Sequence, residues 1–139
     1  MATIGVQPLV LKDVVLTIGT DGYQKHVSAV TFTPSSSQIS WQGLTPDAVF
    51  TDTSTATWTV QLDYVQDWET TDSLSAYLFE NEGETVQMVF APKNATGKKT
   101  FTADVTITPG AIGGQVNQYA TTSVTLGCTK PTIGTIAGE

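Results

Sequence analysis

The sequence contains no arginine, and its six lysines are outnumbered by thirteen acidic residues, which gives a formal net charge of −7. Proteins that hold nucleic acids do so through many cationic contacts to phosphates. Anionic membrane surfaces likewise attract basic segments. The composition therefore argues against a protein that grips nucleic acid or attaches to a membrane.

The sequence also has only one cysteine, Cys128, and one histidine, His26. A single cysteine cannot form a disulfide within the chain, which suits folding in a reducing compartment. A zinc site needs three or four ligands, and these two residues lie far apart in the sequence. Neither a phosphate-binding glycine motif nor a nucleophile-elbow motif occurs. We therefore expect no enzymatic activity, no cofactor and no metal site.

Long apolar runs are missing, and the first residues lack the basic start and apolar stretch of a signal peptide. No segment is apolar enough over sufficient length to span a bilayer as a helix. We therefore expect a protein that is synthesised and folded in a cytoplasm and has no membrane partner.

What the sequence does contain is 25 threonines and 14 valines, β-branched residues that favour strands over helices. Polar and apolar residues alternate in several segments, as expected for strands with one buried face. The alternation predicts strands at residues 9–18, 27–33, 38–42, 58–64, 86–90, 101–107 and 119–126. The sequence thus predicts a mainly β fold in a single domain over residues 1–139.

One segment has helical spacing instead. Leu74, Tyr77 and Leu78 recur at positions i, i+3 and i+4, between capping residues on one side and Gly83 on the other. We predict a short helix over about 72–82, flanking the sheet. Its acidic C-terminal end opposes the helix dipole, so packing must stabilise it.

Residues 43–56 and the two chain ends show no clear periodicity, which predicts a long loop and extended termini. Long loops in compact domains are usually functional. Leu44, Val49 and Phe50 have no evident place in the core of their own domain. We therefore expect residues 43–56, through these three side chains, and the two chain ends to contact another subunit.

Two predicted strands have a fully polar face that must meet water. Those faces carry Thr59, Gln61 and Asp63 in one strand, and Thr102, Asp104 and Thr106 in the other.

The three tryptophans raise the alternative of a sugar-binding platform. Trp58 shares the apolar face of its strand with Val60 and Leu62, so we expect it in the core. Trp41 and Trp68 stay open between core, subunit interface and sugar contact.

The order of the predicted elements resembles that of siphophage major tail proteins, which are the subunits of the tail tube. The resemblance covers about residues 8–133 and rests on order and pattern rather than on an invariant motif. It is carried by residues 58–67, by the helical segment 72–79 with Gly83, by 86–92, by 100–109 and by the closing segment 120–132. The same fold occurs in the tubes of contractile tails and of type VI secretion.

This resemblance implies a β-sandwich or barrel-like fold with one flanking helix. It further implies hexameric rings that stack into a tube for DNA ejection, located in the virion tail. The implied partners are other copies of the chain and the terminator, tape measure and distal tail proteins, with DNA passing through unbound. Under this hypothesis the six polar residues named above face the lumen, and an acidic wall keeps a polyanion mobile. Two alternatives are another phage structural β-protein, such as a capsid decoration or baseplate component, and a stand-alone sugar- or protein-binding β-sandwich.

Overall fold

The structure of the protein is a computed structural model that describes residues 2–136. It is mainly β with one short helix, as the alternating pattern predicted. The elements in chain order are β1 Val15–Ile18, β2 Asp21–Gly22, β3 Val27–Ser35, β4 Gln38–Gln42, β5 Val49–Thr53, β6 Thr57–Val65, α1 Leu74–Glu80, β7 Thr85–Ala91, β8 Lys99–Thr106, β9 Thr121–Cys128 and β10 Thr132–Thr135.

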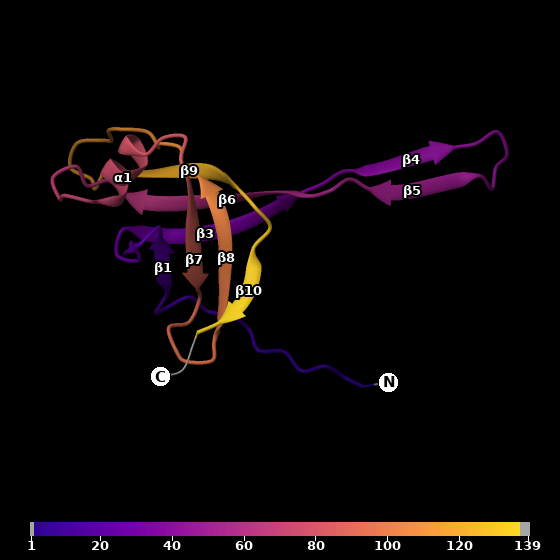
Figure 1. The fold of residues 1–139 in the computed structure, drawn as a ribbon, viewed down its shortest axis with the longest axis horizontal. Coiled ribbons are helices and arrows are strands. Elements are labelled where there is room, and N and C mark those ends of the chain that lie inside the picture. Colours follow the sequence, from indigo (N-terminus) through magenta and orange to yellow (C-terminus); the bar gives the residue numbers. More distant parts are fainter. Residues whose placement is uncertain (1, 137–139) are drawn as a thin grey trace.

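Eight of these strands form one antiparallel sheet that is folded into two layers. Its order is β2-β1-β7-β8-β9-β6-β3, with β10 paired to β8. The layers join at a single residue pair, Val105 of β8 with Cys128 of β9. Figure 1 shows β7 and β8 running across β6 and β3. The order ends at β2 and β3, so within residues 2–136 the sheet does not close into a barrel.

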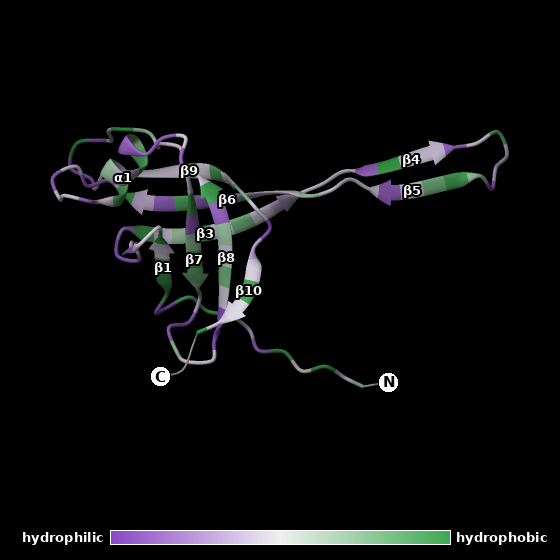
Figure 2. Ribbon diagram, viewed as in Figure 1, coloured by the Kyte–Doolittle hydropathy of each residue, from purple (hydrophilic) through white to green (hydrophobic). Residues whose placement is uncertain are grey.

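The core lies between the two layers, where apolar side chains from both face each other. Val60 and Leu62 of β6 and Leu126 of β9 are fully buried on one side, and Leu16 of β1 and Met88 of β7 are buried on the other. Figure 2 shows the hydrophobic residues spaced along these strands, alternating with polar ones. The period of two therefore identified the buried faces correctly.

Helix α1 closes one end of this core. Its residues Leu74 and Leu78 have no exposed surface and belong to the core cluster. The helix begins after Ser73, whose side chain accepts a hydrogen bond from the backbone N–H of Ala76. Asp72 has a φ of 65°, which is incompatible with a helix, so α1 is shorter than the predicted 72–82.

Three segments differ from the prediction. Of the predicted strand 9–18, only Val15–Ile18 pairs, because the preceding residues find no neighbouring strand. The unpatterned tail contains β10, which pairs with β8. The predicted loop 43–56 contains a strand, since Val49–Thr53 forms β5 opposite β4. All strand residues of β4 and β5 are exposed. Strand β4 was predicted from its own alternation, whereas Val49–Thr53 of β5 does not alternate and was therefore missed.

Candidate assembly surfaces

Strands β4 and β5 form a separate two-stranded sheet that projects from the body of the molecule (Figure 1). The ten residues of the two strands are all exposed. At its base, the backbone N–H of Ser54 donates to the carbonyl of Ser37 at 2.8 Å, and the N–H of Ser37 donates to Oγ of Ser54 at 2.9 Å. An isolated two-stranded hairpin is only marginally stable in water. Within residues 2–136, no other element packs on the strand residues of this hairpin.

One face of this hairpin is apolar except for Asp52, which lies opposite Ile39. Trp41 and Phe50 are direct cross-strand partners with ring centroids 6.0 Å apart, and Ile39 lies two residues along on the same face. Their exposed fractions are 63% for Trp41 and 64% for Phe50. Large aromatic side chains of this kind dominate the energetics of protein interfaces. We call the set Ile39, Trp41 and Phe50 the aromatic face of the hairpin.

The turn at the hairpin tip packs closely around Gly43. The backbone N–H of Gly43 donates to the carbonyl of Ala48, and the side-chain amide of Gln42 donates to the carbonyl of Thr45 at 3.0 Å. A Cβ on Gly43 would lie 2.7 Å from the Cβ of Ala48 and 3.1 Å from the Trp41 ring. Glycine is therefore required here by close packing rather than by an unusual φ.

The predicted interface residues are exposed but do not form one surface. Leu44 lies in the tip turn, while Val49 and Phe50 point to opposite faces of β5, as neighbouring strand residues must. Sequence reasoning missed Ile39 and left Trp41 open. The alternation of Ile39, Ser40 and Trp41 could have identified the shared face, but not that β5 supplies its other half.

The polar residues of β6 lie on the outer side of the layer formed by β3, β6 and β9. Cross-strand register places Ala29, Thr31, Thr33, Ser123, Thr125 and Gly127 on the same side as Thr59, Gln61 and Asp63. The side-chain amide of Gln61 donates to the Asp63 carboxylate at 3.5 Å. None of the nine residues is basic, and none has a large apolar side chain. We call this set the β6 polar face.

Thr102, Asp104 and Thr106 lie on the outer side of the other layer. Val86, Met88, Ala103 and Val105 of β7 and β8 point toward the core, so the residues between them point away from it. Since the two layers pack core to core, their outer sides face different directions. The six residues therefore do not share one surface, contrary to the prediction that they line the same channel. Pattern alone identified each polar face but not the angle between the layers.

The outer face of β1, β7 and β8 differs in chemistry from the β6 polar face. Val15 and Val89 lie among its polar residues and are half-buried. The turn that joins β7 to β8 adds the basic residues Lys93 and Lys98.

The end of the molecule that carries α1 bears a second exposed aromatic pair. The rings of Trp68 and Phe79 meet edge to face at 6.1 Å, and the indole Nε1–H of Trp68 donates to the Gln66 side chain at 3.3 Å. The same Gln66 amide group donates to the carbonyl of Gly113 at 2.7 Å and accepts from its N–H at 3.0 Å. Trp68 is therefore a surface residue, held beside the loop that follows β8.

Asp67 organises the turn before α1. Its carboxylate accepts hydrogen bonds from the backbone N–H groups of Glu69 and Thr70, both at 3.0 Å. Hydrogen bonds from Thr70 and then from Glu69 lower the pKa of the Asp67 carboxyl. This carboxylate is thus used to shape the chain rather than held ready as a proton donor.

The groups with potential chemistry are dispersed. Within residues 2–136, no three metal-ligating side chains come close enough to hold an ion. Burial raises the pKa of the Cys128 thiol, which keeps it protonated at neutral pH. Burial, with a smaller contribution from Asp21, raises the pKa of Tyr23 to about 12. Tyr23 packs edge to face against His26 at 5.7 Å, as aromatic pairs in a core do.

None of the helices in the described part of the chain is long and apolar enough to cross a membrane. No protein-family model matches the sequence, and no curated protein matches it either. The fold, in contrast, is found among solved structures. A chain of the sheath–tube complex of an extracellular contractile injection system, PVC, in its extended state has a TM-score of 0.63 to this protein. The match covers 93% of both chains at 14% sequence identity, a level at which the likeness shows the fold alone.

Proposed function

We propose that this chain is a structural subunit of the tube of a phage tail or of a related injection particle. In this proposal, copies close into hexameric rings that stack into a hollow conduit. The fold likeness to a chain of a sheath–tube complex supports this class of protein. The titratable side chains lie apart from one another, which favours a structural role over catalysis.

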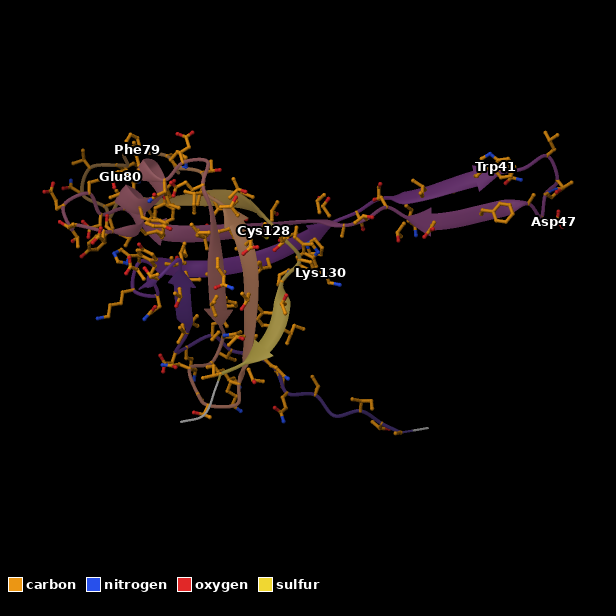
Figure 3. All side chains as sticks on the ribbon, in the orientation of Figure 1. Trp41, Asp47, Phe79, Glu80, Cys128 and Lys130 are labelled. Atoms are coloured by element: carbon orange, nitrogen blue, oxygen red, sulfur yellow. The ribbon has the colours of Figure 1, made fainter. Side chains whose placement is uncertain are left out.

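The exposed hairpin is the observation that carries the proposal. A folded monomer gains nothing from an unpacked hairpin whose aromatic face is in water. A subunit that contacts the next copy through this face gains both hairpin order and interface energy. Trp41 lies far from the body of its own chain (Figure 3), which supports a contact with a second molecule.

Electron microscopy of the purified protein at raised concentration tests this proposal. We expect rings or hollow tubes from the unmodified chain, and their loss in the double variant Trp41→Ala/Phe50→Ala. The matched control is Ser40→Ala/Thr51→Ala, which changes a cross-strand pair on the opposite face of the same hairpin. A protein that stays monomeric at every concentration would contradict the proposal, as would trimers typical of a decoration protein.

The β6 polar face is the proposed wall of the channel, with Thr59, Gln61 and Asp63 at its centre. A wall without basic residues releases no counterions from DNA, and one without large apolar side chains offers no adhesive patch. The outer face of β7 and β8, with Thr102, Asp104 and Thr106, then lies away from the lumen. Its half-buried Val15 and Val89 fit a surface covered by other proteins better than one that DNA must slide along.

Charge reversal distinguishes the two faces. In a particle that conducts DNA, Asp63→Lys adds a ring of cations to the wall, so we expect slow or incomplete DNA release. Raised salt should relieve the defect, because counterion release contributes less as salt rises. Asp63→Asn should be mild, and Asp104→Lys should release DNA normally. If Asp104→Lys is the variant that retains DNA, the wall is the other face.

The proposal also assigns a place and partners. The protein is made in the host cytoplasm and belongs to the tail of a virion or to an equivalent particle. Its partners are other copies of itself, followed by the terminator, tape measure and distal tail proteins that complete such a tube.

A further inference from the structure

The core of this molecule is closed at one end and open at the other. Leu74 and Leu78 of α1 cover the closed end. At the other end, from which β3 and β6 lead out to the hairpin, the two layers diverge and leave an apolar groove of about 350 Å³. Its volume is at the lower end of the roughly 300–1,000 Å³ of ordinary ligand sites.

Aromatic side chains from both layers line this groove. Phe90 of β7 lies between Phe32 of β3, with ring centroids 6.2 Å apart, and Phe101 of β8, at 6.4 Å. Trp58 of β6 contributes to the lining. At the rim, Ile133 of β10 pairs in register with Phe101 and is 64% exposed. The groove is thus a continuation of the core that residues 2–136 leave uncovered.

The hairpin, in contrast, presents apolar side chains that protrude into solvent. Among residues 2–136, none covers its aromatic face and none occupies the groove. The hairpin of the same chain extends away from the body, so it does not fill the groove below its own base (Figure 3). The two features match in chemistry but must come from different molecules.

Charge distinguishes this groove from another exposed apolar site, the Trp68–Phe79 pair. The hairpin carries Asp47 and Asp52 and no basic residue. The groove has Lys130 in its lining. The segment around α1 carries the acidic residues Asp67, Glu69, Asp72, Glu80 and Glu82. Opposite charges favour docking at the groove, and like charges disfavour the α1 end.

We propose that the hairpin of one copy docks into the groove of a second copy, with Trp41 and Phe50 against the aromatic lining and Asp47 or Asp52 near Lys130. This inference rests on the proposed function and names the acceptor surface for the self-contact. The hairpin and the groove are different parts of the chain, so the contact is heterologous. Repeated heterologous contacts build rings or open-ended stacks rather than closed pairs.

A photo-crosslinking amino acid tests the contact in the full chain. With p-benzoylphenylalanine in place of Phe50, irradiation of the assembled protein should give crosslinks between copies at Phe32, Trp58, Phe101 or Ile133, mapped by mass spectrometry. Crosslinks at Trp68, Phe79 or the loop beside them would overturn the proposal.

A second measurement uses the groove rim. Ile133→Glu places a charge at an exposed position facing the groove, and Thr132→Glu places the same charge on the other face of β10. We expect Ile133→Glu to raise the concentration needed for assembly about tenfold or more, as loss of an interface hot spot does. Thr132→Glu should change it little.

The outcomes separate this inference from the proposed function. If the unmodified protein assembles and Trp41→Ala/Phe50→Ala does not, while Ile133→Glu behaves like Thr132→Glu, the groove is the wrong acceptor and the tube proposal stands. If the unmodified protein does not self-associate at all, both proposals are wrong. In a mixture of Trp41→Ala/Phe50→Ala with Ile133→Glu, the intact hairpin of the second variant can dock into the intact groove of the first. Mixed dimers with one such contact should therefore form.

Discussion

The body of the molecule and the β4–β5 hairpin both contain strands in which polar and apolar residues alternate. The apolar face is buried in the body and exposed in the hairpin. Strand β6 alternates between buried and exposed residues, and its buried face packs against strands of the other layer. In the hairpin, Ile39, Ser40 and Trp41 alternate in the same way, yet every strand residue is exposed. An alternating pattern therefore defines an apolar face, and it does not say whether the same chain or another one covers that face.

The difference also concerns stability. The body derives its stability from the burial of apolar area between two layers and under α1. The hairpin has backbone hydrogen bonds and one exposed aromatic pair, which sustain it only marginally. Changes in the body should therefore alter the free energy of unfolding, and changes in the hairpin should alter assembly.

The largest effect on folding is expected in the core. Leu62→Ala removes a side chain with no exposed surface, so the free energy of unfolding should fall by about 2–5 kcal/mol. The neighbouring change Gln61→Ala lies on the polar side and should cost less than about 0.5 kcal/mol. Urea denaturation of both variants checks this, and equal losses would mean that β6 is not buried on one side.

A smaller effect is expected at the start of α1. The Ser73 side chain is buried, accepts from the N–H of Ala76 and donates to the carbonyl of Asp67. Ser73→Ala removes the cap and should destabilise the protein by about 1 kcal/mol. Thr71→Ala, at an exposed position two residues earlier, serves as the control in the same denaturation experiment. A loss no larger than that of the control would show that packing alone holds the helix.

Removal of the hairpin should affect folding still less. Ser37 and Ser54 already pair across its base, so Asn-Gly in place of residues 38–53 closes a short turn there. The free energy of unfolding should then change by less than about 1 kcal/mol, while assembly is lost. Denaturation and sedimentation velocity measure the two quantities. An unfolded product would show that the hairpin is part of the folding unit.

The smallest effect is expected from Asp67, whose pKa is lowered in the folded state. Because the pKa of Asp67 is lower in the folded than in the unfolded state, the ionised carboxylate stabilises the fold at pH values above the unfolded-state pKa. This stabilisation is lost as the pH falls through the folded-state pKa. Asp67→Asn should therefore be less stable than the unmodified protein at pH 7, and the gap should narrow below pH 4. A gap independent of pH would assign the effect to the shape of the turn rather than to charge.

Most strands of the body were predictable because apolar and polar residues alternate along a strand that is buried on one face. The segments 58–64, 86–90 and 101–107 alternate clearly, and each lies in an observed strand or extends at most one residue beyond it. The helix was predictable from Leu74, Tyr77 and Leu78. Strand β10 was missed because Gly134 and the threonines around it form no apolar face.

The candidate surfaces were predictable only in part. The two polar faces and the unplaced apolar residues Leu44, Val49 and Phe50 were identified from the sequence. The pairing of Trp41 with Phe50 was not, because it joins two strands across a turn. The open groove was not predictable either, since Phe32, Trp58 and Phe101 are ordinary core residues in a sequence pattern and gather at an uncovered end only in three dimensions.

The sequence by itself determined the fold class, the positions of most strands, the single helix and a surface poor in positive charge. These properties follow from residue composition and from periods of two or 3.6, which depend on neighbours in the chain. Only the tertiary structure decided which layer each polar face belongs to, that the hairpin lies outside the core, and that the core is open beside it. Those features depend on the angle between layers and on contacts between residues far apart in the chain, which no local period encodes.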